Sequence, residues 1–447
     1  MNGRAARRNG IPDRFPATAQ DMFNYAGRLW HDGQIRCIVR MDGRLDAPLM
    51  ARAVRLSLDV EPVLGCFFVE QRWRPYWQRR GDLDEIDLCP VETGEDVEAR
   101  LWRFLSAPVD PCVGPLVHVR IFRGQTDTLC VKLDHGGGDG VGAMQYLALL
   151  AKTYRRLAEE PQYKPAPAKG SRGQWQVLRQ VGPTGIVGSL GGMHFARPAH
   201  RFPGYGSNAS GRAIALRRVS AARLEMMRQY GRESHAKVND LLLTAFYRAL
   251  FRYLLLQPGE QCTLALPVNL RRYLPPERTI PVANLSGGNA YALSYQAGEP
   301  FEGTLARVVE QSRRFKAAFP GLAGAMMQVV AFAPGFAVGR SLIHRFMGQA
   351  IADGYIGPFL SNVGIIDAPA IDFGLPIADA LGLGLISFPP NLNIAASTFR
   401  GILTLTSGYC PTAIAPEVVE GFLDDVIAEL PDGVATPEKV AAVTTAA

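Results

Sequence analysis

Lys132-Leu133-Asp134-His135-Gly136-Gly137-Gly138-Asp139-Gly140 places a histidine and an aspartate four residues apart in a glycine-rich turn. The apolar run 128–133 ahead of the turn predicts a buried strand, and the apolar residues of 141–157 behind it recur at helical spacing. Glycines between a strand and a helix let backbone or substrate approach closely. Because an imidazole can take up a proton near neutral pH, His135 is a candidate general base.

Two other interpretations of this turn stay open on the residues alone. Asp139 could cap the helix that follows, with His135 merely ending the strand. The segment Gly138-Asp139-Gly140-Val141-Gly142-Ala143 also fits the dinucleotide fingerprint G-x-G-x-x-A. That fingerprint needs a second strand ending in an acidic residue about 20 positions on. The corresponding region, 159–165, has the composition of a loop, so a dinucleotide site is disfavoured.

The turn also resembles a known signature. Asp134-His135-x-x-x-Asp139-Gly140 is similar to the HHxxxDG motif of the chloramphenicol acetyltransferase-like superfamily, which includes nonribosomal peptide condensation domains, wax ester synthases, polyketide-associated acyltransferases and plant acyltransferases. Further pieces resemble elements of that superfamily and occur in its order over roughly residues 16–430: Gly114-Pro115-Leu116-Val117-His118, Val238-Asn239-Asp240-Leu241, Leu266-Pro267-Val268-Asn269-Leu270-Arg271, Leu360-Ser361-Asn362-Val363-Gly364 and Asp372-Phe373-Gly374.

The chain departs from the signature at its first histidine, where Asp134 stands. In the family the second histidine, which matches His135, acts on the acceptor, so the change is compatible with activity. Neighbouring side chains on a strand point to opposite faces. We therefore expect no direct contact between Asp134 and His135.

The resemblance implies an α/β fold with two pseudo-related lobes in a V, a tunnel between them and His135 at its middle. Alternating strand and helix patterns in both halves agree with an α/β fold. The stretch 161–210 is rich in Pro, Gly, Ser and Arg, which predicts a crossover linker with a short helix near 174–180. We accordingly expect an N-terminal lobe at 1–160 and a C-terminal lobe at 211–447.

The chemistry that the resemblance implies is acyl transfer from a thioester to a hydroxyl or amine. His135 would be the general base, and Asp139, the second motif residue, would pair with an arginine that holds the loop. Arg271 matches that arginine, with Arg272 as the alternative. Glycine is expected to be required at Gly140, because a Cβ would clash where the loop meets the helix. Asp372 is expected to be structural, and the candidate oxyanion or tunnel residues are Ser361, Asn362 and Ser407.

No bound cofactor and no metal site are expected. The co-substrate would be acyl-CoA or a phosphopantetheinyl carrier protein, with a small alcohol or amine as acceptor. Two alternatives remain open. One is thioester hydrolysis, with water in place of the acceptor. The other is a non-catalytic member of the same fold, which the presence of Asp134 makes conceivable.

The composition of the chain limits which cellular compartment and which binding partners are expected. The net charge of +7, from 48 basic and 41 acidic residues, suits a phosphorylated donor or an acidic carrier protein. Basic runs interleaved with aromatic residues are missing from the sequence, which disfavours nucleic acid. Seven scattered cysteines without a C-x-x-C pair predict reduced thiols, and residues 1–9 are basic without a following apolar run, so we expect a cytoplasmic protein. The apolar stretch 319–343 predicts core helix or a wall beside a lipid-like substrate, and peripheral membrane contact stays open.

Overall fold

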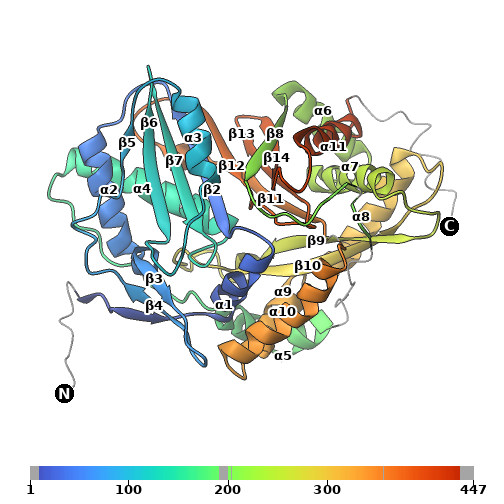
Figure 1. Cartoon of the computed structure of the whole chain (residues 1–447), viewed down its shortest axis with the longest axis horizontal. Coiled ribbons are helices and arrows are strands. Elements are labelled where there is room, and N and C mark those ends of the chain that lie inside the picture. Colours follow the sequence, from blue (N-terminus) through green and yellow to red (C-terminus); the bar gives the residue numbers. More distant parts are fainter. Residues whose placement is uncertain (1–9, 191–199, 203, 356, 433–447) are drawn as a thin grey trace.

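The computed structural model describes residues 10–190, 200–202, 204–355 and 357–432, and it has two lobes side by side, each built around a β-sheet (Figure 1). The strands of the first sheet are β2 (Gln34–Met41), β5 (Val91–Glu92), β6 (Val117–Arg123), β7 (Asp127–Asp134) and β12 (Ile377–Leu383). Their order is β12-β2-β7-β6-β5, so the motif strand β7 lies at the centre. The predicted buried strand is confirmed.

Alternation along β7 explains how this sheet is covered on both faces. Leu129, Val131 and Leu133 pack with helices α2 (Ala47–Val60) and α4 (Gly140–Glu159) in one apolar cluster. Cys130 packs on the other face with helix α3 (Val97–Ser106). Successive strand residues point to opposite faces, so one strand serves both layers.

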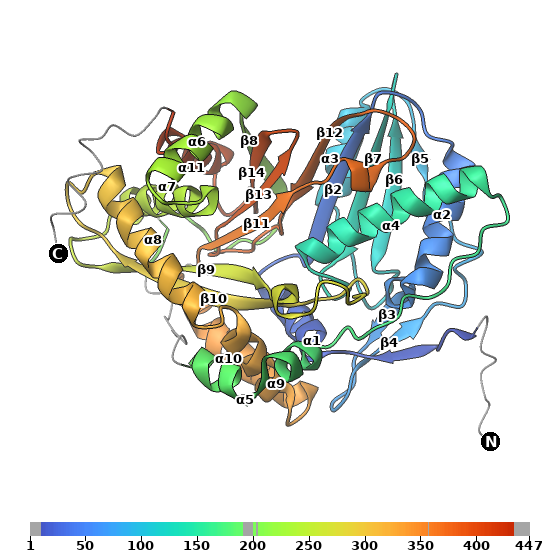
Figure 2. The same ribbon diagram turned by 180° about the vertical axis from the view of Figure 1, so that it is seen from behind.

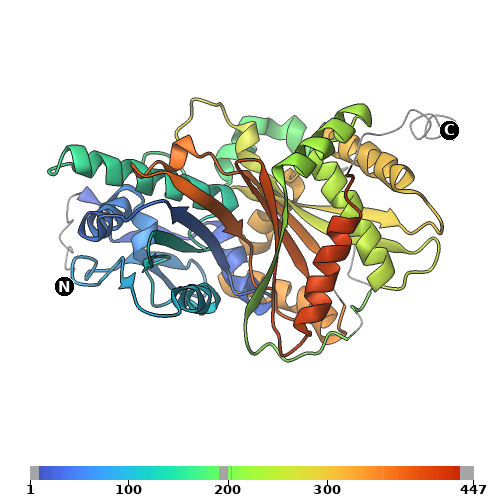
Figure 3. The same ribbon diagram turned by 90° about the horizontal axis from the view of Figure 1, so that it is seen from above.

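The second lobe has a six-stranded sheet of order β10-β9-β11-β13-β14-β8. Four helices pack on this sheet around one large apolar cluster, and α6 begins after an N-cap at Ser220, as its sequence predicts (Figure 3). The strands are β8 (Ala213–Val219), β9 (Gln261–Asn269), β10 (Ser286–Ser294), β11 (Phe359–Ile365), β13 (Asn393–Phe399) and β14 (Ile402–Tyr409), and the helices are α6 (Ala221–Glu233), α7 (Val238–Tyr253), α8 (Phe301–Ala317) and α11 (Pro416–Ala428).

The two lobes are interleaved. Strand β12 comes from the C-terminal part of the chain but pairs antiparallel with β2 in the sheet of the first lobe. The chain therefore crosses between the lobes more than once, and the lobe boundaries expected from the sequence stay a prediction.

A third layer lies below the two sheets in Figures 1 and 2, and it contains helices α1 (Ala19–Ala26), α5 (Trp175–Leu190), α9 (Leu322–Phe332) and α10 (Phe336–Ala352). A small sheet of β1 (Arg14–Pro16), β3 (Cys66–Val69) and β4 (Tyr76–Arg79) adjoins it. The helix expected near 174–180 is confirmed as α5, which continues to Leu190 and bends at Gly182, where φ is 71°.

The apolar stretch 319–343 forms α9 and part of α10, and it is only partly core. Leu322, Phe332 and Phe336 are buried, whereas Met327, Val330, Val338 and Leu342 are exposed, so the stretch is core helix only in part, and the alternative of a wall beside a substrate stays a prediction. Among the described residues no single helix has the length and apolar character needed to cross a membrane. Helices α8 and α9 meet that criterion only as a pair bent by 58°.

Candidate active site

His135 directly follows β7 at the start of the glycine turn, where its side chain is partly buried. Its backbone N–H donates to Gly33 O at 2.7 Å, which ties the turn to the segment before β2. The turn then closes through Gly137 N–H, which donates to Asp134 O at 2.8 Å. The position of the imidazole is therefore fixed by backbone hydrogen bonds on both sides of it.

Asn284, in the loop between η4 (Leu270–Tyr273) and β10, orients the imidazole ring. Its Nδ2 donates to His135 O at 2.6 Å, and also lies 3.3 Å from both Gly136 O and Asp21 Oδ1. Because Nδ2 of Asn284 faces these three acceptors, the other end of the amide, Oδ1, points to the imidazole ring. Oδ1 lies 3.1 Å from His135 Nδ1. His135 Nδ1 is thus held between Asn284 Oδ1 and Asn24 Nδ2, each at 3.1 Å, whereas Nε2 makes no hydrogen bond among the described residues.

Asn24 on α1 and His31 complete the surroundings of the ring. Asn24 Nδ2 donates to His135 O at 2.9 Å and lies 3.1 Å from Nδ1. The His31 and His135 ring centroids are 6.3 Å apart. Burial, with a smaller contribution from the nearby His135, lowers the pKa of His31 to about 3, so His31 is neutral near pH 7. No motif in the sequence pointed to Asn24 or His31.

Asp134, which stands where the superfamily signature has a histidine, is buried and points to Arg28. Arg28 Nη1 donates to Asp134 Oδ2 at 2.7 Å, and Gly136 N–H donates to Asp134 Oδ1 at 2.8 Å. Burial raises the pKa of the Asp134 carboxyl, and Arg28 opposes that rise. The expectation that Asp134 and His135 make no direct contact agrees with this arrangement.

Asp139 joins the two lobes. Its Oδ1 accepts from Gly142 N–H at 2.8 Å and so caps α4, while Oδ2 accepts from Leu285 N–H at 2.8 Å. Arg271 Nη1 lies 2.8 Å from Oδ2, and both side chains are nearly buried. The structure therefore contains the Asp139–Arg271 pair and the helix cap together, and Asp139 makes its contacts away from the His135 ring.

The expectation for Gly140 was wrong. A Cβ at Gly140 would lie 3.5 Å from Val363 Cγ2, which is an ordinary van der Waals contact, so no clash requires glycine there. The tight position is Gly136, where a Cβ would lie 2.7 Å from Trp77 Cη2. Gly142 is also close-packed, since its Cβ would lie 3.0 Å from Ala283 O.

Arg172, from the crossover segment, supports the glycine turn from behind. Its Nη2 donates to Gly137 O at 2.9 Å and its Nη1 lies 3.2 Å from Asp21 Oδ2. Asp21 also accepts from Trp77 Nε1 at 3.0 Å, so one buried carboxylate ties α1, β4 and the crossover together. Composition marked the crossover as a linker and gave no sign of this role.

The remaining predicted residues lie at other places. Asn362 donates to Asn239 Oδ1 at 3.3 Å, and Ser361 is its neighbour on β11, whose Val363 lies beside Gly140. Ser407 is buried on β14 with no partner for its hydroxyl among the described residues. Asp372 is exposed and accepts from Gly374 N–H at 2.7 Å, so it stabilises its own loop. Arg272 does not replace Arg271 as the partner of Asp139.

The described residues contain no group of three or more His, Cys, Asp or Glu side chains that could hold a metal ion. All seven cysteines are free thiols, six of them buried. His135 lines neither the cavity beside α3 that is described below nor a second cavity, whose lining includes Thr18, Trp73 and Arg172. The tunnel through His135 stays a prediction.

The architecture is that of a condensation domain: a mixed α/β chain with two chloramphenicol acetyltransferase-like lobes. The first condensation domain of the calcium-dependent antibiotic synthetase matches with a TM-score of 0.66 at 19% identity, over 95% of this chain and 97% of that one. Polyketide synthase associated protein 5 from Mycobacterium tuberculosis matches with a TM-score of 0.64 at 16% identity, over 93% and 98%. Trichothecene 15-O-acetyltransferase from Fusarium sporotrichioides matches with a TM-score of 0.68 at 12% identity, over 93% and 95%.

Searches by sequence find no relative: no protein-family profile and no curated protein matches the chain. At these identities the likeness to solved structures establishes the fold alone.

Proposed function

We propose that this protein is an acyltransferase that moves an acyl group from a thioester to a hydroxyl or amine, with His135 as the general base. The observation that carries the proposal is the contact of His135 Nδ1 with Asn284 Oδ1, which leaves the Nε2 lone pair for the acceptor. A thioester is already activated, so the protein has to orient the acceptor and remove its proton as it attacks. A well-placed base contributes about 10²–10⁴-fold to such a step.

In the proposed reaction one proton moves from the acceptor to His135 and then from His135 to the leaving thiolate. His135 Nε2 takes the proton of the acceptor O–H or N–H while the acceptor atom bonds to the thioester carbonyl carbon. The tetrahedral intermediate then expels the thiolate as the C–S bond breaks, and His135 returns the proton to sulfur. Negative charge develops on the carbonyl oxygen and needs a donor, for which Ser361 and Asn362 are proposed.

The donor in this proposal is acyl-CoA or an acylated carrier protein, and the acceptor is a small alcohol or amine. Asp139, Arg271 and the close-packed glycines act by holding the turn that carries His135. Seven free thiols agree with the cytoplasmic location that we propose.

Peripheral contact with an anionic lipid surface belongs to the same proposal. Helices α9 and α10 pack together and expose large apolar side chains, among them Val330 at 65% and Leu342 at 54%. Helix α10 also carries Arg345 and Arg340, of which Arg340 pairs with Glu70, and it has no acidic residue. Exposed apolar residues on a helix with basic neighbours are typical of interfacial binding. Val330→Glu and Leu342→Glu should reduce co-sedimentation with phosphatidylglycerol vesicles, whereas Leu255→Glu, at a 73% exposed site elsewhere, should not.

The catalytic proposal is tested by mass spectrometry of free coenzyme A after the protein is mixed with pooled acyl-CoAs, alcohols and amines. His135→Ala is compared with the wild type, and His200→Ala, a histidine that contacts Gln261 O instead, serves as the matched control. Release that requires an acceptor and disappears only in His135→Ala supports acyl transfer. Undiminished release without an acceptor favours hydrolysis. If neither acyl-CoAs nor acylated carrier proteins are consumed, the non-catalytic alternative is correct.

A further inference from the structure

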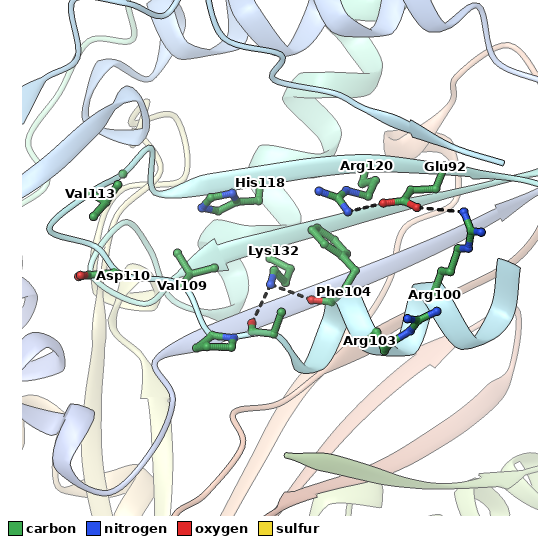
Figure 4. A pocket seen from close by; sticks show the side chains of 13 residues that line it. Glu92, Arg100, Arg103, Phe104, Val109, Asp110, Val113, His118, Arg120 and Lys132 are labelled. Carbon is green, nitrogen blue, oxygen red and sulfur yellow. Dashed lines mark hydrogen bonds and ion pairs between the residues drawn. The ribbon is translucent and has the colours of Figure 1, made fainter. Parts of the chain in front are cut away.

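A cavity of about 730 Å³ lies on the first lobe between α3 and the strands β6 and β7, and we call it the α3 cavity (Figure 4). Its charged lining comprises four cationic side chains against two carboxylates: Arg100, Arg103, Arg120, Lys132, Glu92 and Asp110. Glu92 is already engaged, since it pairs with Arg120 and lies 3.6 Å from Arg100. The surplus of positive charge predicts an anionic occupant.

Lys132 is 2% exposed as a residue, and no carboxylate forms an ion pair with its ammonium group among the described residues. Its Nζ donates to Phe104 O at 2.8 Å and Ala107 O at 2.9 Å, the carbonyls at the end of α3. An ammonium has three donors, so one is left after these two bonds, and Nζ also lies over the Phe104 ring, 4.5 Å from its centroid. A buried charge that faces only neutral acceptors is costly and gains from an anion.

The neighbours of Lys132 add to this unbalanced charge. Arg36, its cross-strand neighbour on β2, uses the nearby carboxylate of Asp32. On the other side of β7, Lys132 is paired with His118 on β6, and Arg120 lies two residues further along β6. Burial, together with the charges of Arg36 and Arg120, lowers the pKa of Lys132 to about 7, and Asp32 opposes this fall.

His118 supplies a complementary acceptor. Its Nε2 is buried without a hydrogen-bond partner among the described residues. Burial lowers the pKa of His118 to about 4, so the ring is neutral near neutral pH. With the proton of the neutral ring on Nδ1, Nε2 is a free acceptor. A ligand that satisfies the whole cavity must accept from Lys132 and donate to His118.

We propose that the α3 cavity binds the phosphate group of a small phosphorylated molecule, with Lys132 and Arg120 as donors to its oxygens and His118 Nε2 as acceptor of its remaining proton. A phosphate that keeps one proton has both properties, whereas sulfate at neutral pH has only acceptors. The cavity has the volume of sites that hold whole organic ligands, so a phosphate monoester fits it better than the free ion. This site is separate from the catalytic one, because none of its lining residues contacts the His135 ring.

Isothermal titration calorimetry with inorganic phosphate, glycerol 3-phosphate and sulfate tests the proposal. The titrations are run near pH 6, about the second pKa of a phosphate monoester. We expect saturable binding of both phosphates, tighter for the monoester, and several-fold weaker binding of sulfate. Lys132→Met should weaken phosphate binding by about 10-fold or more, as expected for a charge-assisted hydrogen bond. His118→Phe should remove the preference for phosphate over sulfate.

Arg52→Met is the matched control, since Arg52 is exposed on α2, on the opposite face of the same sheet. If Lys132→Met fails to fold because its contacts with α3 are lost, Arg103→Met is tested in its place. Arg103 is exposed at the rim of the cavity, and its substitution should weaken phosphate binding by a few-fold. The proposal is overturned if neither phosphate binds saturably, if sulfate binds as tightly as phosphate, or if the cavity variants bind like Arg52→Met.

Discussion

Asn284→Ala is the substitution that most directly probes how His135 is oriented. The wild-type side chain contacts His135 Nδ1 at 3.1 Å and donates to His135 O at 2.6 Å. Alanine removes both contacts and leaves the backbone of the turn in place. The ring is then free to place its proton on Nε2, where it can no longer act as a base.

The expected magnitude follows from the value of one hydrogen bond. A net contribution of about 0.5–1.5 kcal/mol corresponds to a fall in kcat of about 2- to 13-fold, at 1.36 kcal/mol for each factor of ten. Removal of the base itself in His135→Ala should cost about 10²–10⁴-fold. Asn284→Ala should therefore lie between the wild type and His135→Ala. The free energy of unfolding should also fall, by about 1–3 kcal/mol, because buried carbonyls lose a donor.

The assay is the rate of acyl transfer per folded protein as a function of pH. Asn284→Asp places a carboxylate at Nδ1, which stabilises the imidazolium and should move the acid limb of the profile to higher pH. Asn393→Ala is the control, since Asn393 is a buried asparagine on β13 bonded to Leu385 O and Ser387. It should lower stability without changing kcat. Unchanged kcat and pH profile in both Asn284 variants would refute the orienting role.

Two further predictions test the support of the turn, and a third tests a buried carboxyl group, that of Glu61. Arg271→Met should lower the free energy of unfolding by about 3–5 kcal/mol in denaturant titrations, because it leaves Asp139 buried and unpaired; the added Asp139→Asn change should recover part of the loss, and strictly additive losses would contradict the pairing. Gly136→Ala should cost about 1–3 kcal/mol through its contact with Trp77, whereas Gly140→Ala should be tolerated; equal losses would be inconsistent with the clash. Burial raises the pKa of Glu61 from 4.5 to about 7, so the folded protein binds the extra proton and stability falls as pH rises through that window. Glu61→Gln should flatten this fall in thermal unfolding between pH 5 and pH 8, and an unchanged slope would argue against it.

Much of the fold could be predicted because its signals are local. The strand before the motif, the helix after it and the Ser220 cap each follow from patterns within a few residues. The pairing of Asp139 with Arg271 was also predictable, but only because the motifs around both residues resemble those of one superfamily and occur in the same order. Gly140 was misjudged because the space around a Cβ depends on which strand packs against the helix start, and that strand, β11, comes more than 200 residues later.

The sequence by itself determined the α/β character of the chain, the motif strand and helix, and His135 as the candidate base. Only the tertiary structure decided which ring nitrogen of His135 is left for substrate, since Asn24 and Asn284 reach it from 111 and 149 residues away. The same holds for Arg172, which supports the turn from the crossover, and for the row of His118, Lys132 and Arg36 in the first sheet. Periodicity reports which face of an element is buried, whereas hydrogen bonds between distant side chains depend on how the elements pack, and that is set by the whole chain at once.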